Sequence, residues 1–245
     1  MLSPRLIGEL QPVMQSKPKH IVDLSLTLRS RLAVYPGDPP IEIRRVRAMP
    51  EDEVNILELC LSTHHGTHLD APSHQINGGR CLDEYPLSKF INHAVKIDLK
   101  PGKSGPCTHQ KDNILYRRVV TRQDLEVHGD DIAGHGALIL HTGYGPVMQQ
   151  GSVDRDFPYL AADAAQFIRQ FEQINILGID SLSLDAYAAP AEAHRIILSS
   201  PQGIILLESL VNLELLPAEF ILACFPLSIE RSDGAPCRAV AWWDD

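Results

Sequence analysis

The sequence predicts an α/β protein that folds as one domain around a mixed β-sheet. The chain has 245 residues, of which 44% are apolar, and this is enough to form one large buried core. Strand-like runs recur from about residue 21 to residue 243, and helical spacing is confined to a few segments between them. Because strands and helices mix without a strict βαβ alternation, a sheet with a mixed arrangement of strands in a single domain is favoured.

The strands are expected where apolar residues alternate with polar ones or form short runs bounded by turn residues. The clearest alternation lies between residues 54 and 62, where leucines occupy every second position. The expected strands are residues 21–28, 54–62, 93–99, 137–141, 176–180, 203–208, 220–229 and 237–243.

The helices are expected in the second half of the chain. Thr121 is placed to cap a short helix that runs through Leu125. Residues 161–173 carry apolar side chains at helical spacing that should face the sheet, and residues 190–198 are a further helix. The apolar stripe of the longer helix consists of Ala164, Phe167, Ile168 and Phe171. Glycine, proline and polar residues make 100–113 an expected loop.

Composition and charge exclude several function classes. A formal net charge of −9 argues against a nucleic-acid partner, which needs clustered Lys and Arg, and the basic patches at 44–47 and 117–118 read as solvated faces. No apolar run is long enough to cross a bilayer, and no signal peptide is recognised at the N-terminus. The chain has five cysteines, an odd number with no close pairing in the sequence, and this favours reduced thiols and a cytoplasmic location. Residues 1–19 are expected to form an N-terminal arm that covers a surface or a partner subunit, ahead of a domain spanning 20–245.

The most informative segment is Ser62-Thr-His-His-Gly-Thr-His-Leu-Asp-Ala-Pro-Ser-His74, which carries four histidines and one carboxylate in thirteen positions. Imidazole and carboxylate groups are the ligands that Zn²⁺ or Mn²⁺ selects. Pro72 excludes one long helix, and Gly66 permits a bend after a strand, so that His64, His68 and Asp70 can converge on one ion. The alternative is an exposed His-rich loop or a set of core histidines. His65 is expected to be a bystander or to contact a ligand indirectly.

The pattern His64-x-Gly66-Thr67-His68-x-Asp70-x-Pro72-x-His74 resembles the signature of the cyclase family of metal-dependent hydrolases. This family includes bacterial kynurenine formamidases and isatin hydrolases. Similarity extends over about residues 20–241, through the segments Asp23-Leu-Ser25, Tyr35-Pro-Gly-Asp-Pro39, Ala137-Leu-Ile-Leu-His-Thr-Gly-Tyr144, Gly178-Ile-Asp180, Glu208-Ser-Leu-Val-Asn-Leu213 and Asp233-Gly234-x-Pro236. The resemblance implies the swivelling β/β/α cyclase-like fold and a homodimer or larger homo-oligomer.

The resemblance also implies the second half of the site. His194 and Glu208 would bind a second ion, with Asp70 bridging the two, although the turn between them is longer than the family pattern implies. Other interpretations are a surface histidine on a helix and a glutamate paired with an arginine. His74 would be the general acid or base, with a fourth ligand or a group orienting Asp70 as alternatives. Asp180 and Asp185 are expected to play structural or supporting roles.

These features predict an arylformamidase-like hydrolase that uses metal-bound hydroxide to cleave an amide bond of a small aryl formamide or cyclic amide. One or two ions are expected per chain, zinc first and manganese as the alternative. A single-metal, isatin hydrolase-like enzyme acting on lactams or lactones remains an alternative. A non-catalytic metal-binding module and an Fe(II) oxygenase are the alternatives from other classes.

Overall fold

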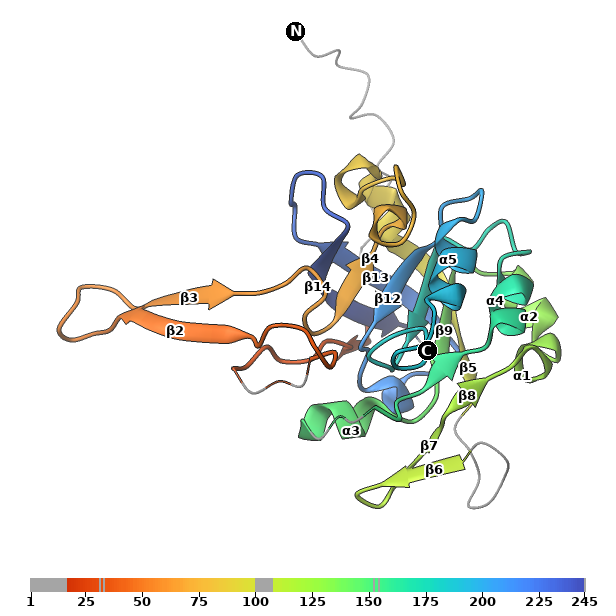
Figure 1. Ribbon diagram of the computed structural model, residues 1–245, viewed down its shortest axis with the longest axis horizontal. Helices are drawn as coiled ribbons and strands as arrows, with labels where there is room; N and C mark the ends of the chain where they lie inside the picture. The colour runs from red at the N-terminus through yellow and green to blue at the C-terminus, as the bar shows by residue number, and fades with distance from the viewer. Residues whose placement is uncertain are drawn as a thin grey trace, which may run out of the picture.

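The computed structural model describes residues 17–30, 32, 34–99, 108–151, 153 and 155–244 (Figure 1). Eight strands form one sheet in the order β1 (His20–Asp23), β14 (Gly234–Trp243), β13 (Glu219–Pro226), β5 (Ile91–Asp98), β9 (Ala137–His141), β11 (Ile176–Ile179), β12 (Ile205–Glu208) and β4 (His68–Asp70). Strand β4 also pairs with β14, so the sheet closes on itself like a barrel. The pairs among β5, β9, β11 and β12 are parallel and the others are antiparallel. The predicted α/β fold with a mixed sheet is confirmed.

Alternation along the strands creates two cores, one inside the closed sheet and one beneath the helices. In β9, Ala137 and Ile139 point into the first core, whereas Leu138 and Leu140 point into the second. The second core is covered by α1 (Arg122–Glu126), α4 (Ala162–Ile168) and α5 (Glu192–Leu198), which lie along one side of the sheet in Figure 1. The remaining helices are α2 (Gly129–Ala133), α3 (Gly145–Gln150) and the 3₁₀ helices η2 (Pro72–His74), η3 (Leu82–Glu84), η4 (Leu87–Phe90) and η5 (Leu213–Leu215).

A long two-stranded ribbon projects from the body of the molecule (Figure 1). It consists of β2 (Glu42–Arg47) paired antiparallel with β3 (Ile56–Cys60). Every residue of β3 is exposed, so the strand expected at 54–62 exists but belongs to this ribbon and not to the central sheet. Strand β2 was not predicted, because its three arginines read as a solvated face, and they are indeed largely exposed. The other small strands are β6 (Thr108–Lys111), β7 (Ile114–Arg117), β8 (Val119–Val120) and β10 (Tyr159–Leu160).

Other element boundaries differ from the prediction for local reasons. The helix expected over 161–173 ends at Ile168, because the hydrogen bonds that follow join residues three apart, as in turns. The loop expected at 100–113 contains the start of the β6–β7 hairpin, and residues 100–107 lie outside the described part. The helix after Thr121 is confirmed, with the Asp124 carboxylate accepting hydrogen bonds from the Thr121 N–H and hydroxyl at 2.8 and 2.7 Å.

Asp180, at the end of β11, organises the neighbouring turn. Its carboxylate is buried and accepts hydrogen bonds from the backbone N–H groups of Thr142, Gly143 and Tyr144 at 2.8, 2.9 and 3.0 Å. These groups precede α3, so the carboxylate serves backbone donors that would otherwise be buried without partners. The structural role expected for Asp180 is confirmed.

Within the described residues, no helix has the length and apolar character needed to cross a bilayer. Residues 1–16 of the predicted arm lie outside the described part of the chain, and that arm stays a prediction.

Candidate metal centre

Strand β4 is the element on which the candidate site is built. Successive side chains of a strand point to opposite faces, so His68 and Asp70 share one face while Leu69 is completely buried in the core on the other. Pairing with β12 places His68 opposite Glu208, and pairing with β14 places Asp70 opposite Gly234. A three-residue strand thus brings together groups that are more than a hundred positions apart in the sequence.

The turn before β4 places the His64 side chain beside those of His68 and Asp70. Gly66 has a φ of +67°, a left-handed conformation that strains any residue with a Cβ atom, so the backbone of this turn favours glycine. His64 Nδ1 then lies 2.7 Å from Asp70 Oδ1, and His68 Nε2 lies 3.3 Å from the same oxygen. The predicted convergence of these three residues is confirmed as geometry.

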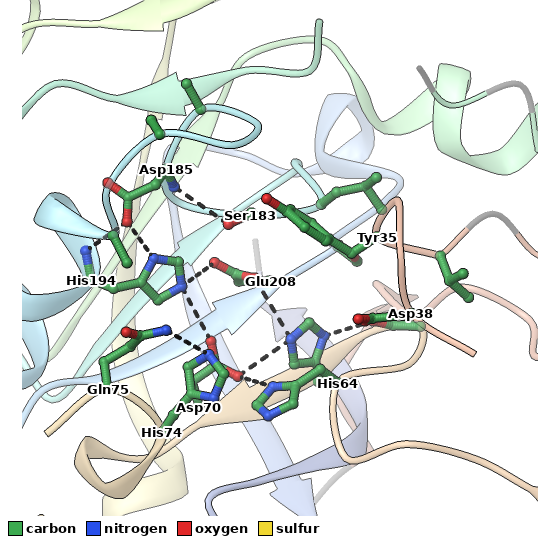
Figure 2. A pocket seen from close by; sticks show the side chains of 18 residues that line it. Tyr35, Asp38, His64, Asp70, His74, Gln75, Ser183, Asp185, His194 and Glu208 are labelled. Carbon is green, nitrogen blue, oxygen red and sulfur yellow. Dashed lines mark hydrogen bonds and ion pairs between the residues drawn. The ribbon is translucent and has the colours of Figure 1, made fainter. Parts of the chain in front are cut away.

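The second group of candidate ligands reaches the same point from α5 and β12 (Figure 2). His194 Nε2 lies 3.2 Å from Glu208 Oε1 and 3.6 Å from Asp70 Oδ2, and Glu208 Oε2 lies 3.6 Å from His68 Nε2. Both His194 and Glu208 are buried. The readings of His194 as a surface residue and of Glu208 as the partner of an arginine are therefore wrong. The turn between α5 and β12 is longer than the family pattern implies, but His194 and Glu208 still lie at the candidate centre.

Each of the three candidate histidine ligands has one ring nitrogen held by an oxygen outside the centre. His68 Nδ1 lies 2.9 Å from the Gly66 carbonyl, His194 Nδ1 lies 2.6 Å from Asp185 Oδ2, and His64 Nε2 lies 3.0 Å from an oxygen of Asp233. The other nitrogen of each ring faces Asp70 or Glu208. Histidines that bind metals in proteins are usually oriented in this way.

The donor atoms fit a divalent ion. Asp70 Oδ2 is buried and has no hydrogen-bond partner among the described residues, which is costly for a carboxylate oxygen unless a cation neutralises it. Three imidazole nitrogens lie close to the two oxygens of the Asp70 carboxylate, and the Glu208 carboxylate lies beside two of them, a donor set suited to Zn²⁺ or Mn²⁺. His64, His68, Asp70, His194 and Glu208 are therefore the residues that could hold one or two ions.

The charges of the candidate ligands depend on one another. Burial alone would raise the pKa of Asp70, but the neighbouring His68, His194 and His64 outweigh burial and hold that pKa well below its usual range. For His64, burial alone would lower the pKa, and the Asp70 and Asp233 carboxylates together raise it to about 9. Burial alone would also lower the pKa of His194, but the surrounding carboxylates of Asp185, Asp70 and Glu208 outweigh burial and raise that pKa well above its usual value. Without a cation, the histidines supply the positive charge that the carboxylates need.

His74 lies beside this cluster in η2, with its ring centroid 4.1 Å from that of His64. Its Nδ1 lies 3.4 Å from Asp233 Oδ2, and its Nε2 lies 3.4 Å from the side-chain amide nitrogen of Gln75. Burial lowers the pKa of His74, which favours the neutral ring. The ring lines the cavity, and its position is compatible with the expected acid–base role as well as with that of a further ligand.

The centre lies in a cavity of about 300 Å³. The candidate ligands form its polar side, and an apolar wall comes from the segments around residues 34–35 and 182–191. Tyr35 and Asp38 border it through a tight turn, in which the Asp38 N–H donates to the Tyr35 carbonyl at 3.0 Å and Gly37 adopts a φ of +113°. The cavity has room for a small organic molecule next to the converging side chains.

Two residues outside the predicted set belong to the site. Asp233 contacts both His64 and His74, although the sequence indicates it only as part of a segment that resembles the family. Asp185, expected to play a supporting role, accepts the hydrogen bond from His194. His65 is buried, but its Nδ1 accepts a hydrogen bond from the Ser62 N–H and it does not line the cavity, in agreement with its expected bystander role.

Comparison with known proteins identifies the family. A family model described as "Putative cyclase" matches residues 22–186, about two thirds of the chain. The chain belongs to the cyclase family. A cyclase-family relative named "Kynurenine formamidase", from Geobacillus thermodenitrificans, is 30% identical over 225 residues, covering 89% of this chain and 95% of the relative. A second protein with that name, from Salinibacter ruber, is 30% identical over 226 residues, covering 90% of this chain and 96% of the relative.

Solved structures share the cyclase-family fold. An isatin hydrolase bound to the product analogue thioisatinate superposes with a TM-score of 0.75 at 22% identity, covering 92% of each chain. A Bacillus stearothermophilus protein described as a predicted metal-dependent hydrolase superposes with a TM-score of 0.67 at 22% identity, covering 91% of this chain and 97% of the other. These likenesses extend over nearly the whole described domain.

Proposed function

We propose that this cyclase-family protein is a metal-dependent hydrolase that cleaves the amide bond of a small aryl formamide, as an arylformamidase does. The observation that carries the proposal is the buried convergence of His64, His68, Asp70, His194 and Glu208 on the polar side of a cavity. The two relatives named kynurenine formamidase support this choice of substrate, because each aligns over about nine tenths of the chain.

His64, His68 and Asp70 would hold one ion, and His194 and Glu208 would hold a second, with Asp70 between them. A bound divalent ion supplies a Lewis acid for the substrate carbonyl and lowers the pKa of a water molecule towards neutrality. The protein side chains set the donor geometry in advance, since Gly66, Asp185 and Asp233 each fix one of the histidine rings.

His74 would move the protons. The Gln75 amide nitrogen can donate only to an unprotonated His74 Nε2, and the Asp233 carboxylate can accept only from a protonated Nδ1. In this tautomer the lone pair is on Nε2, which would exchange its long contact with Gln75 for a water molecule, take a proton from it and return that proton to the leaving nitrogen. The lowered pKa of His74 favours the neutral ring that this step needs. The cavity walls would orient the substrate and exclude bulk water.

The test combines metal analysis with turnover. Protein loaded with Zn²⁺ or Mn²⁺ should hydrolyse N-formylkynurenine or formanilide and bind two ions per chain. His74→Ala should retain both ions but lose roughly 10²- to 10⁴-fold in kcat, as expected for the loss of a general acid–base group. Loss of metal from His74→Ala would instead identify His74 as a ligand. Metal-loaded protein that turns over no formanilide, lactam or lactone would refute the proposed function.

A lactam hydrolase that uses a single ion is the second candidate, because the isatin hydrolase complex is similar in fold over 92% of the chain. The two candidates differ in what His194 and Glu208 do. If one ion binds per chain and isatin is hydrolysed in preference to formanilide, the second candidate is correct. His194→Ala then leaves the metal content unchanged, whereas it halves the content of a two-ion enzyme.

A further inference from the structure

Asp233 and Gly234 form the turn that leads into β14 and lie directly against His64. The Asp233 carbonyl accepts a hydrogen bond from the Ala71 N–H at 2.8 Å, which ties this turn to the end of the metal motif. The Asp233 carboxylate lies 3.0 Å from His64 Nε2 and 3.1 Å from the Thr63 hydroxyl. The turn therefore contacts both the backbone and the side chains of the candidate metal centre.

Gly234 provides the space in which the His64 ring lies. A Cβ atom at position 234 would lie 2.6 Å from His64 Cε1, 3.0 Å from His64 Nδ1 and 2.8 Å from the Leu69 carbonyl oxygen. Such distances are shorter than carbon atoms tolerate, and the Leu69 oxygen is part of the β4 backbone, which cannot move freely. The ring can therefore approach Asp70 only because residue 234 has no side chain.

We infer that Asp233 and Gly234 together are a positioning element for His64. Gly234 leaves room for the ring, and Asp233 accepts the proton of Nε2, so Nδ1, which lies 2.7 Å from Asp70 Oδ1, is the nitrogen whose lone pair would serve a metal ion when one is bound. The same Asp233 oxygen lies 3.4 Å from His74 Nδ1, so one carboxylate sets the orientation of both a metal ligand and the proposed acid–base residue. This inference rests on the proposed metal centre.

The test measures metal affinity and the His64 tautomer, independently of turnover. Wild type, Asp233→Asn and the matched control Asp131→Asn are titrated with Zn²⁺ against a chromophoric chelator. The tautomer of His64 is read from its ¹⁵N chemical shifts in the Zn²⁺-loaded protein. Asp233→Asn should keep the wild-type stoichiometry at saturation, lose about 10- to 100-fold in affinity and change the His64 tautomer signal. The control, which alters an exposed residue, should match wild type.

Three results would overturn the inference. An affinity within threefold of wild type together with an unchanged tautomer signal shows that Asp233 does not position His64. Loss of an ion at saturating Zn²⁺ shows that Asp233 is itself a ligand. A wild type that binds no ion overturns this inference and the proposed function together, whereas a wild type that binds ions but hydrolyses nothing overturns only the function. Gly234→Ala, followed by circular dichroism, checks the steric part and should lower affinity at least as much.

Discussion

Removal of bound metal should make the stability of this protein fall as the pH rises from about 6.5 to about 9. In the metal-free protein, burial alone would lower the pKa of His64, but Asp70 and Asp233 outweigh burial and raise that pKa from 6.5 to about 9. Between these two values the folded protein binds more protons than the unfolded chain does. The stabilisation is therefore complete below pH 6.5 and is lost as the pH rises through 9.

The size of the effect follows from the pKa difference. A difference of about 2.5, at about 1.4 kcal/mol for each pKa unit, amounts to about 3 kcal/mol. The His64 side chain is only 20% exposed, so solvent screening reduces this value little. The raised pKa values of His68 and His194 act in the same direction. The expected loss is a large fraction of the roughly 5–15 kcal/mol that stabilises an ordinary domain.

The assay is urea unfolding in a metal chelator at closely spaced pH values from 6 to 9.5. His64→Gln should show a shallower pH dependence than wild type, because one of the contributing groups is absent. Protein saturated with Zn²⁺ should show no such loss over this range, since the ion replaces the protons. A metal-free wild type whose stability is constant or increases between pH 6.5 and 9 would refute the electrostatic account of the site.

Three further predictions concern single residues. Asp180→Asn should lower the free energy of unfolding by about 3–5 kcal/mol in urea, because an amide group cannot accept all the bonds that the buried carboxylate accepts. Gly79→Ala should cost about 1–3 kcal/mol and reduce kcat, since its Cβ would lie 2.6 Å from the backbone carbon of Pro72, just before His74. Asp185→Asn should weaken binding of one ion about 10- to 100-fold, measured by chelator competition, while the other ion remains.

The core of the site could be predicted from the sequence because it is local. His64, His68 and Asp70 lie within seven positions, and one glycine turn followed by one short strand brings them together. The residue types indicated the chemistry, and their spacing around Gly66 and Pro72 excluded a continuous helix. His194 and Glu208 could be placed only through the family resemblance, since no local pattern links α5 and β12 to β4.

Asp233 could not be singled out because its place depends on long-range pairing. It lies 169 positions from His64 in the sequence, and only the β4–β14 pairing brings the two together. The ribbon shows a similar limit. The alternation between residues 54 and 62 correctly predicted a strand, but alternation does not say which strand it pairs with or whether either face is covered. Which strand a given strand pairs with depends on the arrangement of the whole sheet, and a local sequence pattern does not contain that information.

The ribbon and the central sheet give two cysteines very different environments. Cys60, the last residue of β3, is exposed and precedes His64 by four positions. Cys224 is buried in β13, and burial raises the pKa of its thiol to about 12. A thiol-reactive dye at neutral pH should therefore modify Cys60 and leave Cys224 untouched. A fluorescent reporter can thus be attached at the root of the ribbon without disturbing the interior of the barrel.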